Sequence, residues 1–250
     1  DDLAVGGDII TTSAGTSNVR VGVSAGSSIE SGGNHNVAVG NEAGTAITTG
    51  DGNIVIGFES GHDITTGGYN LLIGWKAGDK IDTASQNVAI GDGSLSADTK
   101  GSKSVAVGSN TLNTQNFTSA TDSYNTAVGY NAGVSVTTGI NNTLIGGLAG
   151  DAITTGFSNS LVGKLSGSAL TDADYNVAMG QQSLAQDTKG SASVAIGSFA
   201  LGTQNFTSAT DSYNTAVGYA AGSAITTGIY NNLVGSLTGD ALTDADSNVA

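Results

Sequence analysis

The amino-acid sequence predicts an all-β protein, a parallel β-solenoid or β-roll of about 12 coils. Twelve copies of a five-residue motif lie between Asn36 and Gly235: Asn or Ser, any residue, Ala, Leu or Val, then Val, Ile or Met, and Gly. The marker glycines that end these motifs are 17 residues apart, except for two steps of 21 residues. The 250 residues include 39 glycines, no proline and only 11% charged residues. A short fixed repeat of this composition is typical of a solenoid, in which each coil packs only on its neighbours.

The motif predicts a β-strand in every coil. Adjacent strand residues point to opposite faces, and both residues before each marker glycine are apolar. One of the two fills the interior of its own coil. The other needs a second surface, because a strand that is apolar on both faces is buried on both. A thin solenoid has no second surface of its own, so we expect another copy of the chain to cover this face.

A second strand is expected in each coil, in segments such as Ala46–Gly50 (Ala-Ile-Thr-Thr-Gly). Seven residues past the marker glycine, eight coils carry Ile, Val or Leu, and the other four carry Asp98, Gln115, Asp187 or Gln204. Those four coils have leucine at the fourth position past the marker, where the other eight have glycine: Leu95, Leu112, Leu184 and Leu201. Loss of a buried leucine side chain costs on the order of 2–5 kcal/mol. The exchange therefore indicates that both columns fill one core.

Columns of glycine and asparagine are assigned to the turns. Glycine at the end of the strand and four residues later permits positive φ in tight corners. Asparagine begins ten of the twelve strands; it tolerates the left-handed region and bonds to the local backbone. Stacked in register, equivalent asparagines can also form a hydrogen-bonded ladder. This structural role in turns and ladder is assigned to Asn36, Gly40, Asn53, Gly57, Asn70, Gly74, Asn125, Gly129, Asn214 and Gly218.

The two 21-residue steps are the candidate binding segments. They lie 89 residues apart, and the segment from Gly202 to Tyr213 repeats the one from Asn113 to Tyr124 except at its first residue. Four additional residues cannot be taken up by the strands, so they are expected to project as loops, where binding residues usually lie. The candidate receptor-contact residues are Asn116, Phe117, Tyr124, Asn205, Phe206 and Tyr213. The alternative is that the aromatic side chains fold back and cover the roll.

Composition and charge limit the partners. The net charge of −14 argues against nucleic acid as a partner. The chain has no cysteine, so neither a disulfide framework nor a thiolate metal site is possible. No apolar run approaches the ~20 residues of a membrane span. We expect an irregular cap or junction over residues 1–35, with degraded copies at Leu3–Gly6 and Asn18–Gly22, and a repeat array over 36–250 that continues beyond the fragment.

Catalytic and metal-binding constellations are weak. His35 and His62 lie in different repeats without a catalytic partner at a suitable spacing, and we expect both to be exposed loop residues. The Asp-x-Asp loops at 171–174 and 243–246 suit Ca²⁺ only weakly, because such ions take several oxygen ligands. The acids are spread through loop columns and aromatic residues make up 5%, which does not favour the paired carboxylates of a glycosidase. We predict no enzyme activity and no cofactor.

The repeated Asn-x-Ala-Val/Ile-Gly motif resembles the head repeats of trimeric autotransporter adhesins, the YadA-like β-roll, over residues 36–250 and loosely over 18–35. Units such as Asn125–Gly133 also resemble arrays in phage tail fibres. The resemblance implies a left-handed roll and a homotrimer with three parallel rolls around one axis. The 17-residue unit and the 21-residue coils depart from the adhesin pattern.

The expected function is that of a structural and adhesive fibre module, namely a segment of a trimeric phage tail fibre that takes part in host attachment. The head of a bacterial cell-surface adhesin is the alternative of the same class. A polysaccharide-degrading β-solenoid tailspike is the alternative of a different class. The expected location is a virion tail fibre or a cell surface, with a host glycan or protein as the possible partner and no membrane insertion.

Overall fold

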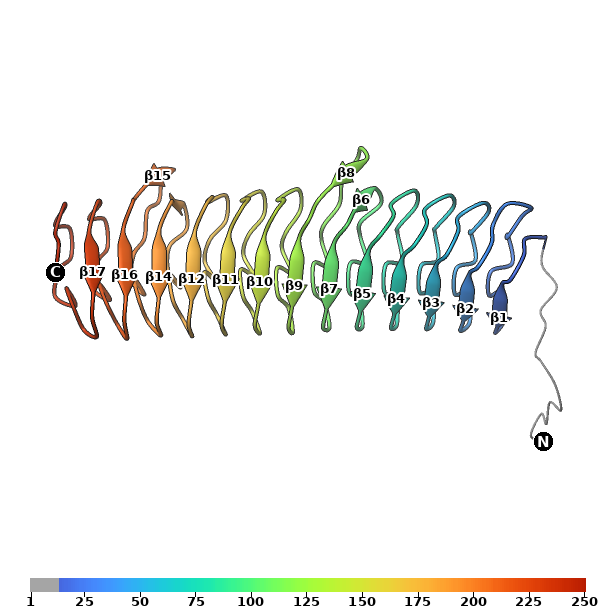
Figure 1. Cartoon of the computed structure of the whole chain (residues 1–250), viewed down its shortest axis with the longest axis horizontal. Helices are drawn as coiled ribbons and strands as arrows, with labels where there is room; N and C mark the ends of the chain where they lie inside the picture. Colours follow the sequence, from blue (N-terminus) through green and yellow to red (C-terminus); the bar gives the residue numbers. More distant parts are fainter. Residues whose placement is uncertain (1–13) are drawn as a thin grey trace, which may run out of the picture.

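A computed structural model describes residues 14–250, which form one rod of stacked coils (Figure 1). Thirteen short strands, one per coil, make a single parallel sheet along the rod. They are β1 (Val19–Val21), β2 (Val37–Val39), β3 (Ile54–Ile56), β4 (Leu71–Ile73), β5 (Val88–Ile90), β7 (Val105–Val107), β9 (Thr126–Val128), β10 (Thr143–Ile145), β11 (Ser160–Val162), β12 (Val177–Met179), β14 (Val194–Ile196), β16 (Thr215–Val217) and β17 (Asn232–Val234). The all-β parallel solenoid is therefore confirmed, with about 13 turns rather than about 12.

The additional coil comes from the segment expected to be irregular. β1 pairs in parallel with β2, and Val19 lies opposite Val37. The degraded copy at Asn18–Gly22 is thus a regular coil of the stack, while the copy at Leu3–Gly6 lies outside the described residues. Residues 14–250 contain no helix, and therefore no helix long enough to cross a bilayer.

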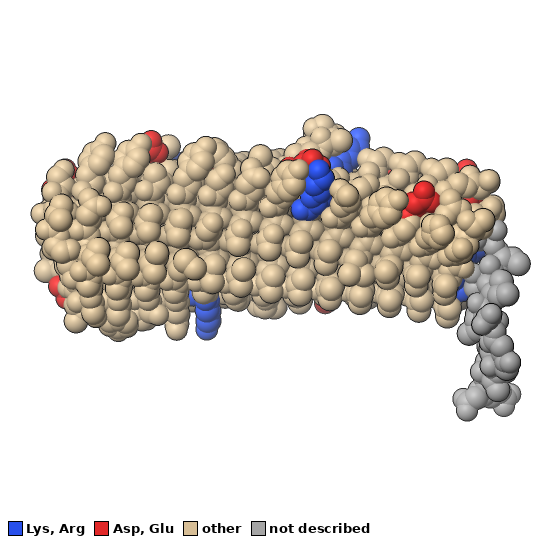
Figure 2. Space-filling model, viewed as in Figure 1, with Lys and Arg blue, Asp and Glu red and all other residues tan. Residues whose placement is uncertain are grey.

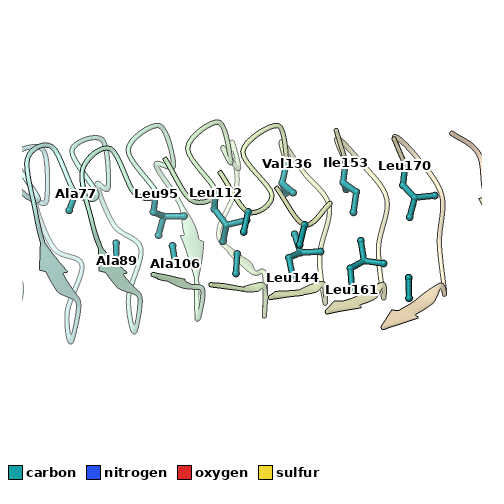
Figure 3. Packing of buried hydrophobic residues seen from close by; sticks show 14 of the residues in the cluster. Ala77, Ala89, Leu95, Ala106, Leu112, Val136, Leu144, Ile153, Leu161 and Leu170 are labelled. Atoms are coloured by element: carbon teal, nitrogen blue, oxygen red, sulfur yellow. The ribbon is translucent and has the colours of Figure 1, made fainter. Parts of the chain in front are cut away.

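The core is one continuous column inside the coils, formed by two facing rows of apolar side chains (Figure 3). The middle residue of each strand from β2 to β17, such as Ala38 or Leu72, is completely buried. On the opposite wall, Ile47 and its equivalents are completely buried too, namely Ile64, Ile81, Val136, Ile153, Leu170 and Ile225, while Leu242 in the last coil is partly buried. These residues lie in irregular backbone between a turn and a bend, so the prediction of a second strand around Ala46–Gly50 is wrong. The side chain points into the core, but the backbone around it does not form a ladder.

Each coil fills that wall from one of two positions, either the one occupied by Ile47 or the one occupied by Leu95, as the sequence predicts. Leu95, Leu112, Leu184 and Leu201 are completely buried in the same core as Ile47. A Cβ atom added to Gly44 would lie 2.7 Å from Cδ1 of Ile47. The two positions therefore compete for one volume, and a coil can fill only one of them. Every coil with such a leucine also has alanine in the middle of its strand, at positions 89, 106, 178 and 195.

The asparagine ladder is present, but asparagine is not needed at this position for its backbone conformation. The backbone N–H and Nδ2 of Asn53 both donate to Oδ1 of Asn36, at 2.9 and 3.1 Å, and Asn70 repeats both bonds to Asn53. Nδ2 of Asn53 also donates to the carbonyl oxygen of Gly67. The left-handed residue is the one before the asparagine, for example Tyr69 with φ of 59°. Asparagine is thus selected for its buried amide.

The marker glycines are required by the approach of the next coil as well as by φ. Gly40 has φ of 137°, and a Cβ atom there would lie 2.4 Å from the carbonyl oxygen of Gly57. Gly44, four residues later, has φ of 56°. The glycine turns expected from the sequence are therefore confirmed.

Candidate binding surface at the two long coils

The two 21-residue coils place short arms on one edge of the rod. β8 (Thr121–Asp122) pairs in parallel with β6 (Gly101–Ser102), and β15 (Thr210–Asp211) pairs in the same way with β13 (Gly190–Ser191). The segments that carry β8 and β15 rise above the outline of the other coils (Figure 1). Residues 118–120 and 207–209, at the tips, are exposed. The additional residues project, as the constant length of the strands requires.

A buried polar group supports the first arm. It consists of Asp98, Gln115, Ser104, Ser123 and Asn125, all completely buried, and is called the Asp98 network below. Nε2 of Gln115 donates to Oδ2 of Asp98 at 2.5 Å and to Oγ of Ser104 at 2.9 Å. Oε1 of Gln115 accepts from Nδ2 of Asn125 at 2.8 Å. The network thus takes the place of the isoleucine in the core and carries the asparagine ladder across the long coil.

The carboxylate of Asp98 also determines where the arm begins. Its Oδ1 accepts from the backbone N–H groups of Gly101, the first residue of β6, at 2.9 Å and of Phe117, which precedes β8, at 3.3 Å. Burial raises the pKa of Asp98, and the hydrogen bonds from Gln115 and from the backbone oppose that rise. Asp187, Gln204, Ser193, Ser212 and Asn214 form the same arrangement beneath the second arm. Because all these groups are closed off from solvent, their role is structural.

The phenylalanines and tyrosines expected at the receptor contact separate into two sets. Phe117 and Phe206 are 6% and 7% exposed, so their rings belong to the wall of the roll and the fold-back alternative holds for them. Tyr124 and Tyr213 are about half exposed. Asn116 and Asn205 are exposed, and each accepts a hydrogen bond from a threonine hydroxyl of the preceding coil. The surface of each arm is therefore the tip, the asparagine and the tyrosine.

The two arms have nearly the same sequence but different neighbours. Nζ of Lys103 donates to Oδ2 of Asp122 at 2.6 Å and lies 5.1 Å from the centre of the Tyr124 ring. The hydrogen bond between Lys103 and Asp122 raises the pKa of Lys103 and lowers the pKa of Asp122. These three groups hold the first arm against the adjacent coil.

The second arm has no lysine at this place. Ala192 replaces Lys103, and Tyr213 stacks on Tyr230 of the following coil, with ring centres 5.4 Å apart. The charge of nearby Asp211 raises the pKa of Tyr213. The second arm thus presents a pair of half-exposed aromatic rings where the first presents an ion pair. Sequence reasoning compared the arms only with each other and did not find this difference, which lies in the flanking coils.

A second cluster resembles a cation site but is already occupied by a lysine. Ligand atoms of His62, Asp63 and Asp79 lie within 4.8 Å of one another. Nζ of Lys80 is 3.1 Å from Asp63 and 3.5 Å from Asp79, so an ammonium group already supplies the positive charge. His62 is partly buried and contacts Asp63, so the expectation of an exposed residue is wrong for His62, whereas His35 is exposed as expected.

The Asp-x-Asp loops have a structural use in the backbone. Oδ1 of Asp174 accepts from the N–H of Phe157 at 2.9 Å, and Asp246 accepts in the same way from Ile229 at 2.8 Å. Asp172, the first acid of its loop, lies 3.8 Å from Nζ of Lys189. Burial raises the pKa of Asp174. One carboxylate of each loop is therefore engaged in joining two coils.

Comparison with known proteins gives no match: no protein-family model, no curated protein and no solved structure is similar to this chain. The arrangement itself defines a parallel β-solenoid rod with two arms on one edge.

Proposed function

We propose that this chain is a structural and adhesive fibre module that works as a homotrimer, with three parallel rolls side by side. The observation that carries the proposal is an apolar column along the outside of the sheet. It is formed by the residue before each marker glycine, Val39, Ile56, Ile73, Ile90, Val107, Val128, Ile145, Val162, Met179, Ile196, Val217 and Val234, none of which is buried in the single chain.

The shape of this column favours another copy of the chain as its occupant. It runs the length of the rod and repeats once per coil, so a partner must have the same length and the same spacing. Figure 2 shows few, scattered charged side chains on the side of the rod in view. Large exposed apolar surfaces mark interaction sites. The resemblance to YadA-like repeats supports three copies and a left-handed roll.

Within this proposal the module belongs to a phage tail fibre and takes part in host attachment. A rigid rod that carries projecting arms at two levels is suited to multivalent contact, since several weak sites on one body raise the overall affinity by 10²–10⁴. The two arms of one chain lie five coils, ~24 Å, apart. A cell-surface adhesin head would use the same surface; the domains encoded next to this segment distinguish the two.

The first experiment is the native mass of the full chain by light scattering. We expect three times 24.4 kDa. Replacement of Val128 and Ile145 by aspartate should give a folded monomer, because charges would then have to be buried in the interface. A wild-type monomer would contradict the trimer.

The second experiment removes residues 118–121 and 207–210 from both arms, which restores the 17-residue step. The shortened trimer should keep its mass and its β-sheet circular dichroism but lose adhesion of the labelled protein to bacterial cells. Undiminished adhesion would show that the arms are spacers. Release of sugar products from purified surface polysaccharide would instead favour the depolymerase alternative.

A further inference from the structure

A groove of about 270 Å³ lies beside the second arm, between three successive coils. Its walls are Gln182, Ala185, Gln186, Phe199, Gly202, Thr203 and Ser223. The 89-residue duplication supplies a matched position in the first block, at Asn113 in place of Gly202. This is the only residue at which the two 12-residue insert segments differ.

In the first block the asparagine fills this space. Nδ2 of Asn113 donates to the carbonyl oxygen of Gly93 and to Oγ of Ser96, both at 2.8 Å. In the second block the carbonyl of Gln182 replaces that of Gly93, and among the described residues no group donates to it. A Cβ atom on Gly202 would lie 3.7 Å from this oxygen. Gly202 therefore leaves both a space and a free acceptor.

The groove also contains a partly exposed aromatic ring, that of Phe199. Phe199 has φ of 63° and is 37% exposed, at the position where the first block has Asn110. Asparagine is enriched in the left-handed region, whereas a bulky residue there costs on the order of 1 kcal/mol or more. The ring of Tyr219 contacts Phe199 edge to face, with centres 6.0 Å apart. The same position, two residues after the marker glycine, also has a positive φ at Leu148 and Leu165, so what distinguishes this coil is a partly exposed aromatic ring beside the space left by Gly202.

We propose that this groove binds one neutral sugar ring. The C–H face of a sugar suits the ring of Phe199, and its hydroxyls suit the free carbonyl and the side-chain amides of Gln182 and Gln186, which make no hydrogen bond within the described residues. None of the lining residues is charged, which disfavours an anionic ligand. The volume is below the 300–1,000 Å³ of drug-sized pockets, so a single ring fits better than a chain. The inference rests on the proposed adhesive function, whose target it narrows to a neutral surface glycan.

The test is saturation-transfer NMR and titration of the full chain with methyl glycosides of glucose, galactose, mannose and N-acetylglucosamine. We expect transfer from aromatic protons to at least one of the four glycosides. Gly202→Asn should weaken that binding at least tenfold, because the first block shows that the same backbone accepts asparagine. Phe199→Asn should do the same. The matched control is Asn113→Gly, which alters the first block and should leave the affinity unchanged.

Absence of binding to all four glycosides, or undiminished binding by Gly202→Asn, overturns the proposal. Adhesion to bacterial cells is measured on the same variants, so that the two ideas fail separately. Cell adhesion without glycoside binding would support the adhesive function and contradict the proposal that the groove binds a sugar. Glycoside binding without cell adhesion would support the sugar site in the groove and contradict the proposed adhesive function.

Discussion

Gln115 donates to Asp98 from the next coil, and the amide of Gln115 is thereby held in one orientation. Its oxygen is then available to Asn125, which continues the ladder of asparagines. A carboxyl group replaces isoleucine in the core at this place, and its two oxygens accept hydrogen bonds from Gln115 and from the backbone of Gly101 and Phe117. The relationship connects the interior of the roll to the position of the arm.

Asp98→Asn is expected to destabilise the chain by about 1–3 kcal/mol, the cost of a buried polar group without a partner. The side-chain NH2 group of the new asparagine would face Nε2 of Gln115, and both groups are donors, so no hydrogen bond could form between them. The double variant Asp98→Asn with Gln115→Glu restores a donor facing an acceptor and should recover part of the loss. Chemical denaturation measures both. Equal stability of the single and double variants would show that the orientation of Gln115 does not matter.

The raised pKa of Asp98 predicts a pH dependence. The folded chain keeps this proton at pH values where the unfolded chain, with a pKa near 3.8, has lost it. The contribution of Asp98 to the free energy of unfolding is therefore complete below the unfolded pKa and is lost as the pH rises through the folded pKa. The difference in stability between wild type and Asp98→Ala should change in that sense over this range. A constant difference across the range would contradict the raised pKa.

Gly44→Leu should destabilise the chain, because its Cβ would lie 2.7 Å from Cδ1 of Ile47 and because φ is 56°. Overpacking of this kind costs about 1–3 kcal/mol. Adding Ile47→Ala should relieve the overlap and recover stability, since Leu95 occupies the same position in a coil without isoleucine. Thermal unfolding of the single and double variants checks this. If Ile47→Ala gives no recovery in the Gly44→Leu background, the two positions do not share one volume.

Asn53→Ala should cost several kcal/mol, on the order of 1–3 for each buried group left unpaired. The carbonyl of Gly67 and the N–H of Asn70 would both lose their partner. Asn41→Ala, at an exposed position one coil earlier, is the control and should change stability by less than about 0.5 kcal/mol. Similar unfolding midpoints for the two variants would argue against the ladder.

The periodic part of the fold could be predicted from the sequence because each column repeats one physical requirement many times. Ile47 and Leu95 were assigned to one core since their exchange conserves volume. The expected strand around Ile47 was wrong because burial of a side chain says nothing about the hydrogen bonds of its backbone. A three-residue strand in β1 was enough to begin the stack, whereas the degraded motif there suggested an irregular cap.

The candidate site was less accessible to sequence reasoning. Whether Phe117 or Tyr124 faces solvent depends on the N–H of Phe117 reaching Asp98, nineteen residues earlier. The difference between the arms depends on Lys103 and Ala192, which lie outside the repeated segment. The one signal for the groove was the change from Asn113 to Gly202, and its meaning required the position of the Gln182 carbonyl.

The asparagine ladder has a direction. Where asparagines follow one another, each donates to the asparagine of the coil before it and offers its oxygen to the next, as Asn53 does between Asn36 and Asn70. The bonds between asparagine side chains therefore have one polarity along the rod, whereas the backbone bonds run both ways: the N–H of Val37 donates to Asn53 in the next coil, and the N–H of Gly40 donates to Val21 in the previous one. A gene segment that encodes whole coils can be copied and rejoined without a mismatch, which fits the occurrence of two nearly identical insert segments 89 residues apart. The length of the rod can thus change in evolution by whole coils, while a partial coil would interrupt the ladder.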